Sequence, residues 1–286
     1  MRTLVHLSDL HFGRIDHALL EPLRRNVWRL EPNVVVVSGD LTQRAHAEQF
    51  REARRFLDTL PSPQIVVPGN HDVPLYNVFK RFLKPLDNYM RFISSDLEPA
   101  YIDQEIAVVG INTARSLTFK SGRISEDQVE GVRAHLCRLP ETITKIVVTH
   151  HPFDLPPNWD KDHIVGRAPL AMQMFSRCGA DILLAGHVHM SHAGHTTARY
   201  KIEGFSALVI QAGTATSTRG RGELNSFNAL RIVRDAVTVE RYVWEPKNND
   251  FTRARSDTFR RAANGWIPTT DAPERAPAAE SSSANR

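Results

Sequence analysis

Cysteine is scarce in this sequence, with only Cys137 and Cys178 among 286 residues. Each lies in an amphipathic stretch typical of a helix, and the two do not form a Cys-x-x-Cys pair. We therefore predict two buried free thiols. No internal repeat is visible either, which argues against a solenoid.

Long apolar runs are also absent. Runs such as Val34–Val37 fall far short of the roughly 20 residues that a membrane-spanning helix needs. Met1 leads directly into the apolar run Leu4–Leu7, without the basic region, longer apolar stretch and cleavage site of a secretion signal. We expect a soluble, cytoplasmic protein with no membrane span.

Charge of either sign is not concentrated enough to suggest a polyanionic partner. The net charge is +4, and the charged (24%) and hydrophobic (41%) fractions are typical of soluble globular proteins. No run of Arg and Lys is interleaved with aromatic residues, so nucleic acid is disfavoured as a partner. A homodimer is compatible with this composition.

Short apolar runs alternate with helical patterns along the first part of the chain, which is typical of βαβ units. From about residue 207 the strands follow one another without helices, which predicts a second, more antiparallel sheet. We expect one domain over residues 1–265 and a disordered tail over residues 266–286, because Thr269–Arg286 is rich in Pro, Ala and Ser.

The segment over residues 73–99 departs from this alternation. Tyr76, Phe79, Phe82, Leu83 and Leu86 recur at near-helical spacing directly after a candidate catalytic motif. One interpretation is an amphipathic helix packed on the core. The other is a cap insertion that borders the substrate pocket.

Polar side chains follow five of the apolar runs, at the point where each run ends. Sites in open α/β sheets form outside the carboxyl ends of the strands, so we expect these side chains to converge. The candidates are Asp9 and His11 after Leu4–Leu7, Asp40 after Val34–Val37, Asn70 after Ile65–Val67, His150 after Ile146–Val148, and His187 and His189 after Ile182–Leu184.

These residue types are metal ligands in combination. Imidazole with carboxylate favours zinc, iron or manganese over calcium and magnesium. Seven donors are too many for one tetrahedral zinc ion but suit two ions. Taken singly, each segment could be a turn, and His150 could be a hydrogen-bonded core histidine; five segments together indicate a metal site.

The order of the motifs resembles the calcineurin-like metallophosphoesterase family. The matching segments are Asp9-Leu10-His11, Gly39-Asp40, Gly69-Asn70-His71-Asp72, a later His150, and Gly186-His187-Val188-His189. The resemblance implies an α/β fold, a four-layer α/β/β/α sandwich of two mixed sheets with a binuclear metal site at the carboxyl ends of the strands. It also implies two metal ions, manganese or iron, with zinc as a further option.

The resemblance implies a role for each motif residue. Asp9, His11 and His189 would hold one ion, Asn70, His150 and His187 the other, and Asp40 would bridge both. His71 would protonate the leaving oxygen, and Asp72 would orient its imidazole. His151 is the alternative to His150 as a ligand.

The motif form is closest to bacterial class III cyclic-nucleotide phosphodiesterases. We therefore expect hydrolysis of a small phosphodiester by a hydroxide that bridges the ions. A lipid-A-precursor-type pyrophosphohydrolase, a phosphomonoesterase and a nuclease remain alternatives, because the motifs set the chemistry and not the substrate. Tyr76, Arg115, Arg219 and Arg221 are candidate substrate contacts, although the arginines could equally belong to solvated surface turns.

Overall fold

The structure, a computed structural model, describes residues 1–75, 78–117, 121–156, 159–196, 199–200, 202–218, 222–263 and 265–269. Its strands are β1 (Arg2–Leu7), β2 (Val34–Ser38), β3 (Gln64–Val67), β4 (Ala100–Ile102), β5 (Ile106–Gly110), β6 (Thr144–Val148), β7 (Ile182–Ala185), β8 (His192–His195), β9 (Leu208–Gln211), β10 (Ser226–Val233), β11 (Ala236–Glu245), β12 (Asp250–Ala262) and β13 (Gly265–Pro268). Its α-helices are α1 (Leu20–Arg29), α2 (Ala47–Leu57), α3 (Val78–Leu83), α4 (Asp87–Phe92), α5 (Glu126–Leu136) and α6 (Ala168–Cys178), and its 3₁₀ helices are η1 (His17–Leu19), η2 (Asn70–Asp72) and η3 (Lys161–His163).

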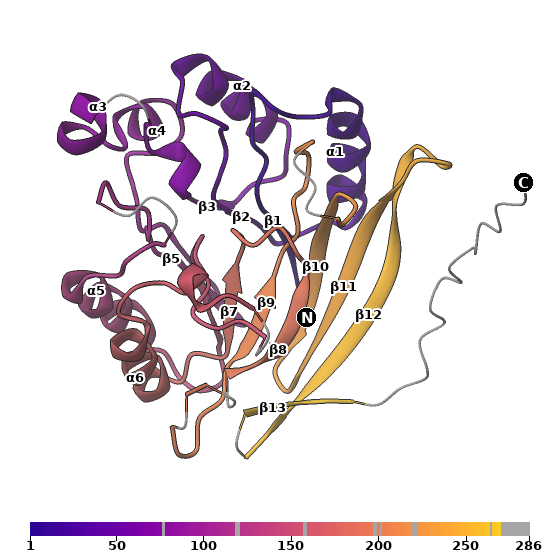
Figure 1. The fold of residues 1–286 in the computed structure, drawn as a ribbon. Helices are drawn as coiled ribbons and strands as arrows, with labels where there is room; N and C mark the ends of the chain where they lie inside the picture. Colours follow the sequence, from indigo (N-terminus) through magenta and orange to yellow (C-terminus); the bar gives the residue numbers. More distant parts are fainter. Residues whose placement is uncertain are drawn as a thin grey trace, which may run out of the picture.

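The strands form two mixed sheets that face each other (Figure 1). One sheet has the order β13-β12-β11-β10-β1-β2-β3, in which β1, β2 and β3 are parallel and the others antiparallel. The other has the order β4-β5-β6-β7-β9-β8, with a parallel centre and antiparallel edge strands. The parallel strands of both sheets follow the βαβ alternation of the sequence.

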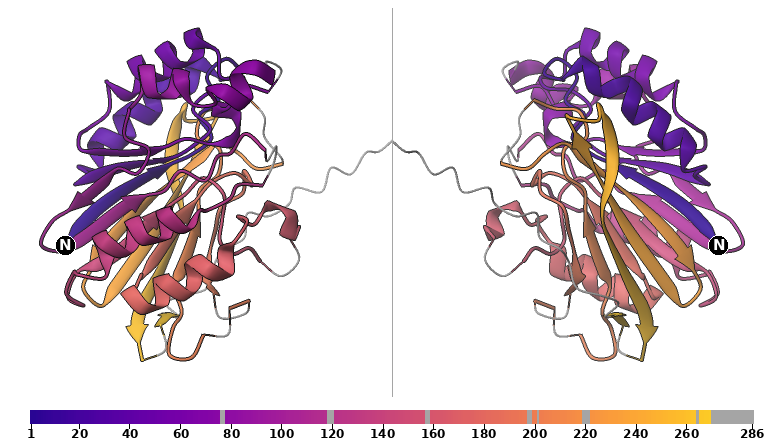
Figure 2. Two further views of the ribbon diagram at one scale, coloured as in Figure 1. Left: turned by 90° about the vertical axis from the view of Figure 1, so that its left-hand side faces the viewer. Right: turned by 90° about the vertical axis from the view of Figure 1, so that its right-hand side faces the viewer.

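Three apolar layers separate four layers of secondary structure. Val34 and Val36 of β2 contribute to the layer between the sheets, whereas Val35 and Val37 point to the layer beneath the helices. A strand buried on both faces needs this continuous apolar sequence. Helices α1 and α2 cover one outer face and α5 and α6 the other (Figure 2). The predicted four-layer α/β/β/α sandwich is confirmed.

Helix α5 begins with a capping box formed by Ser125 and Gln128. The Ser125 hydroxyl accepts a hydrogen bond from the Gln128 amide, and the Gln128 side chain accepts one from the Ser125 amide. This capping box satisfies amide groups that the first turn of a helix leaves unpaired.

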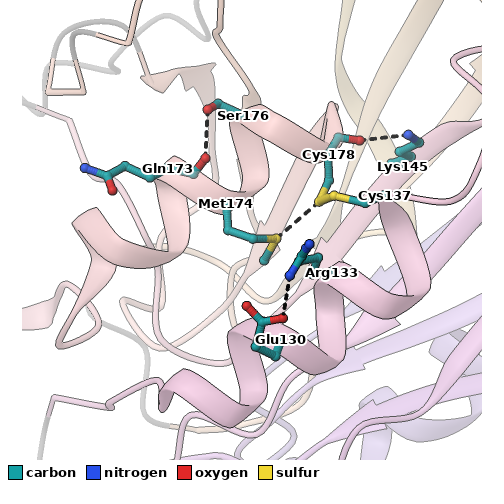
Figure 3. Close-up of a disulfide and its surroundings, with 8 residues drawn as sticks. All are labelled: Glu130, Arg133, Cys137, Lys145, Gln173, Met174, Ser176 and Cys178. Atoms are coloured by element: carbon teal, nitrogen blue, oxygen red, sulfur yellow. Dashed lines mark hydrogen bonds and ion pairs between the residues drawn. A yellow bond between two sulfur atoms is a disulfide. The ribbon is translucent and has the colours of Figure 1, made fainter.

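The prediction of two free thiols is wrong, because Cys137 and Cys178 form a disulfide across 41 residues of sequence (Figure 3). Cys137 follows the last residue of α5 and Cys178 ends α6, and these helices lie side by side on one sheet. Cys178 is buried and Cys137 is exposed. The helical patterns predicted where each cysteine lies along its helix, but not that both helix ends would meet.

Residues 73–99 form two short helices rather than one. Pro85 separates α3 from α4, as expected of a residue that cannot continue the hydrogen-bond ladder. Tyr89 of α4 is fully buried, and its hydroxyl donates to the Val66 carbonyl. The α4 part therefore packs on the core, while the α3 part has exposed apolar residues that are described below.

The C-terminal strand corrects a predicted boundary. β13 pairs with β12 and continues to Pro268, so a domain end at residue 265 would cut through a strand. The rest of the predicted tail, from residue 270, lies outside the described residues. Within the described part of the chain, no helix has the length and apolar character needed to span a membrane.

Candidate metal centre

The seven predicted ligands lie together at one edge of the two sheets. The donor atoms of four of them, all buried, are within 4.8 Å of one another: Asp9, His11, Asp40 and His189. In this group Asp9 Oδ1 lies 3.5 Å from His11 Nε2 and 3.3 Å from His189 Nε2. The first sheet supplies three of these side chains and the second supplies His189.

A second group surrounds the amide oxygen of Asn70. Asn70 Oδ1 lies 3.1 Å from His150 Nε2 and 3.0 Å from His187 Nδ1. His151 joins His150 and His187 in a cluster of buried imidazoles that could hold an ion. The Nδ1 atom of His151 is 2.8 Å from the Thr113 hydroxyl, while His150 directs Nε2 toward Asn70. The geometry favours His150 over His151.

Asp40 lies between the two groups and faces both. Its Oδ1 is 3.4 Å from His150 Nε2, and its Oδ2 is 3.7 Å from His11 Nε2. Oδ1 also accepts a hydrogen bond from the His71 amide. A carboxylate with one oxygen toward each group can serve two ions at once.

Backbone strain is concentrated on the predicted ligands. Positive φ angles occur at Asp9 (53°), His11 (54°), Asp40 (52°), His187 (72°) and His189 (60°), which makes five of the nine such non-glycine residues in the described chain. Each costs about 1–3 kcal/mol and persists only where its surroundings fix it. These five residues lie in the loops that follow three strands, β1, β2 and β7, so these loops are shaped for the site and not for stability.

Two glycines allow the ligand loops to approach one another. A Cβ at Gly186 would lie 1.8 Å from the Ser8 hydroxyl, and one at Gly69 would lie 2.1 Å from Asp40 Oδ1. Both distances are too short for any side chain. The glycines of the Gly-Asn-His-Asp and Gly-His-Val-His motifs are therefore required for close packing of the centre.

The buried polar atoms of the first group fit a cation. Asp9 Oδ2 accepts hydrogen bonds from the Ser8 hydroxyl and the His187 amide, whereas Asp9 Oδ1 and both ring nitrogens of His11 make none with the described residues. Buried charges are paired or coordinate metals. Carboxylate and imidazole donors in this arrangement suit zinc, iron or manganese.

The electrostatics of the second group point the same way. Burial disfavours the charged forms of both Asp40 and His150. Nevertheless the imidazoles, led by His150, hold the pKa of Asp40 well below its usual range, and Asp40 raises the pKa of His150 to about 9. In the metal-free protein the carboxylate thus holds a proton on His150. A metal ion would take the place of that proton.

His71 lies beside the first group, but Asp72 does not orient its ring as predicted. His71 Nδ1 is 3.0 Å from the Gln43 carbonyl oxygen, and its ring lies 4.9 Å from that of His11. The Asp72 carboxylate instead accepts hydrogen bonds from the amides of Leu41, Thr42 and Gly69. Burial and the nearby Asp40 charge raise the pKa of Asp72 to about 6. Through these hydrogen bonds Asp72 connects the loop after β2 to the loop after β3.

Arg115 is the predicted substrate contact that lies within the described residues. The Arg115 guanidinium donates to the carbonyl oxygens of Asn112 and Ala114 and to the Gln128 side chain. These bonds connect its own loop to the start of α5, and a role in substrate binding stays a prediction. Tyr76, Arg219 and Arg221 lie outside the described residues.

The structure adds one residue that the motifs did not indicate. His163, in the 3₁₀ helix η3, places Nδ1 2.9 Å from Nε2 of His187. The other nitrogen of His187 faces Asn70, so His163 contacts the side of the ring that points away from the second group. A histidine 24 residues from its partner, in a loop without a motif, gives no signal in the sequence.

Comparison with known proteins places these features in a family context. The family model described as calcineurin-like phosphoesterase matches residues 2–191, which include all seven predicted ligands. The purple acid phosphatase PPD1 of yellow lupin has a similar fold, with a TM-score of 0.66 and 12% identity over 90% of this chain and 53% of that one. This likeness shows the fold.

Three curated relatives are similar in sequence. The glycerophosphodiester phosphodiesterase GpdQ of Enterobacter lignolyticus is 27% identical over 53% of this chain and 58% of its own length. The 3′,5′-cyclic adenosine monophosphate phosphodiesterase CpdA of Escherichia coli is 24% identical over 60% and 59%. The UDP-2,3-diacylglucosamine pyrophosphatase LpxG of Chlamydia muridarum is 34% identical over 26% and 23%. The chain thus spans less than two thirds of the length of each.

Proposed function

This chain belongs to the calcineurin-like phosphoesterase family, and from that premise we propose that it is a metal-dependent hydrolase that cleaves a small phosphodiester. The observation that carries the proposal is the pair of donor groups that share Asp40. We assign Asp9, His11 and His189 to one ion and Asn70, His150 and His187 to the other. Manganese, iron and zinc are the ions that suit these donors.

When bound, two such ions would supply a nucleophile at neutral pH and neutralise charge on the phosphate oxygens. The remaining roles belong to side chains of this protein. Asp9 and Asp40 fix the positions of the cations through buried carboxylates, and His150 is held by a hydrogen bond from Nδ1 to the Ser38 carbonyl. That bond leaves Nε2 of His150 as the donor toward the centre.

His71 is the proposed general acid. With the Nδ1 proton donated to the Gln43 carbonyl, the proton that can be transferred resides on Nε2. The leaving oxygen of the ester would take this proton, a contribution of about 10²–10⁴-fold in rate for general acids. Because its amide binds Asp40 Oδ1, His71 is positioned by the shared carboxylate itself.

The relatives support a diester as substrate. Two of the three act on phosphodiesters according to their names, one on a glycerophosphodiester and one on a cyclic nucleotide. The second candidate is a pyrophosphate bond in a lipid-linked nucleotide. It is favoured by the 76-residue segment that is 34% identical to LpxG.

The test is a substrate panel with metal-reconstituted protein. The panel comprises bis-p-nitrophenyl phosphate, p-nitrophenyl phosphate, 2′,3′- and 3′,5′-cyclic nucleotides, a UDP-linked diacyl sugar and single-stranded DNA. We expect the highest kcat/KM on a small diester. Preference for the UDP-linked lipid would select the second candidate, and activity only on the monoester would overturn the diester proposal.

A further inference from the structure

Helix α3 turns its apolar side chains toward solvent. Phe79, Phe82 and Leu83 are 76%, 48% and 64% exposed, although at about 100° per residue they form one continuous arc of the helix. The opposite face carries Arg81, which is only 3% exposed. An amphipathic helix that served the fold alone would face the core with its apolar arc. This helix has the reverse orientation.

The orientation is fixed by specific bonds. The Arg81 guanidinium donates to the carbonyl oxygens of Ser116, at 2.7 Å, and Pro74, at 3.0 Å. Burying a guanidinium is costly unless it is hydrogen-bonded, and burial lowers the pKa of Arg81. The residues that follow Pro74 and Ser116 in the chain, Leu75 (38% exposed) and Leu117 (80% exposed), are exposed as well.

We call Phe79, Phe82 and Leu83 the α3 surface. Monomeric soluble proteins rarely expose large apolar side chains in such a group, and contiguous exposed patches mark sites of interaction. Figure 1 shows α3 at the outer edge of the molecule, near α4. The surface is therefore accessible to a large, flat partner.

Basic side chains border the α3 surface. Lys80 in α3 and Lys84 directly after it are exposed, and so is Arg91 on neighbouring α4. The exposed acid in these two helices is Asp87. A two-fold contact between copies of the chain through this surface would bring like charges together. An anionic lipid surface accepts both the apolar arc and the lysines.

We propose that the α3 surface adsorbs to anionic lipid bilayers. Phe79, Phe82 and Leu83 would enter the boundary between headgroups and acyl chains, and Lys80, Lys84 and Arg91 would contact lipid phosphates. Arg81 of α3 donates to the carbonyl oxygen of Pro74, two residues after Asp72, so adsorption would hold the loop that carries Asn70 near the headgroups. The inference goes beyond the proposed hydrolysis and does not depend on it.

The experiment is cosedimentation of the full chain with vesicles, without added metal or substrate. Phosphatidylcholine vesicles are compared with vesicles that also contain phosphatidylglycerol. We expect binding to the anionic vesicles that falls at least about tenfold in the double variant Phe79→Ser/Leu83→Ser. Lys84→Glu should reduce vesicle binding by about fivefold or more. Added salt should weaken the binding of the wild-type protein to the anionic vesicles.

The matched control is Ile267→Ser, which removes a 54% exposed apolar side chain from β13 and should bind as wild type does. Circular dichroism and analytical ultracentrifugation accompany each variant. Two results of the vesicle assay would overturn the proposal: no binding to anionic vesicles, or equal binding by the double variant and the wild-type protein. A third would be a wild-type protein that is a dimer and does not bind vesicles, when the double variant Phe79→Ser/Leu83→Ser is a monomer. The last result would assign the surface to a second copy.

Discussion

The replacement His163→Ala tests whether the binding of one metal ion can be weakened while the binding of the other is unchanged. A ligating imidazole has to keep one nitrogen bare, and the partner of the other nitrogen fixes both the tautomer and the ring orientation. For His187 that partner is His163 Nδ1, at 2.9 Å from Nε2. We expect weaker binding of the ion near Asn70 and unchanged binding of the ion near Asp9.

The size of the effect follows from the contact. Loss of such a supporting bond lowers metal affinity by about 10–100-fold. His163 is only half-buried, so water can replace part of the contact, and we expect the lower end, about tenfold or about 1.4 kcal/mol. The free energy of unfolding should change by less than about 1 kcal/mol, because no residue of η3 is buried.

The assay is calorimetric titration of metal-free protein with manganese or zinc, resolved into two binding steps. His163→Gln, which keeps a hydrogen-bond acceptor, should restore much of the affinity. His135→Ala, at an exposed position of α5, is the control. Equal weakening of both steps, or no weakening of either, would refute the assignment of His163 as a positioning residue.

Four further replacements or conditions test other parts of the structure. Asp40→Ala should lose both ions, and elemental analysis that still finds about two ions per chain would contradict the shared carboxylate. His71→Ala should retain the metals but lose about 10²–10⁴-fold in kcat; metal loss or full activity would contradict its role. Metal affinity should rise with pH up to about 9, because His150 has to release its proton; calorimetry at several pH values that finds a flat profile would contradict this. Replacement of Cys137 and Cys178 by serine should lower the free energy of unfolding by up to about 4 kcal/mol in the chain-entropy model, given the 41-residue separation; urea denaturation that shows no loss would contradict a stabilising disulfide.

The sequence predicted the parts of the site that depend on strand ends. Asp9, Asp40 and Asn70 each follow a strand buried on both faces, and such strands have an unmistakable apolar pattern. Parallel neighbours then bring their carboxyl ends to one edge, so the meeting of the ligands follows from topology.

The features that the sequence did not predict depend on contacts between distant loops and helices. The disulfide requires α5 and α6 to end side by side, and the contact of His163 with His187 requires η3 to fold over a ligand loop. From the sequence, the Asp72 carboxylate could accept a hydrogen bond from the His71 ring or from backbone amides. The geometry of the loops brings it to the amides of Thr42 and Gly69. For α3, apolar periodicity predicts a helix but not which way its apolar arc faces.

The most direct measurement of the central claim is hydrolysis of bis-p-nitrophenyl phosphate as metal-stripped protein receives increasing amounts of manganese, iron or zinc. We expect activity to rise until about two ions are bound per chain. Asn70→Ala, which removes a donor of only one group, should bind one ion and be nearly inactive. Full activity with one ion per chain, or no activity with any of the metals, would contradict a phosphoesterase that works through two ions.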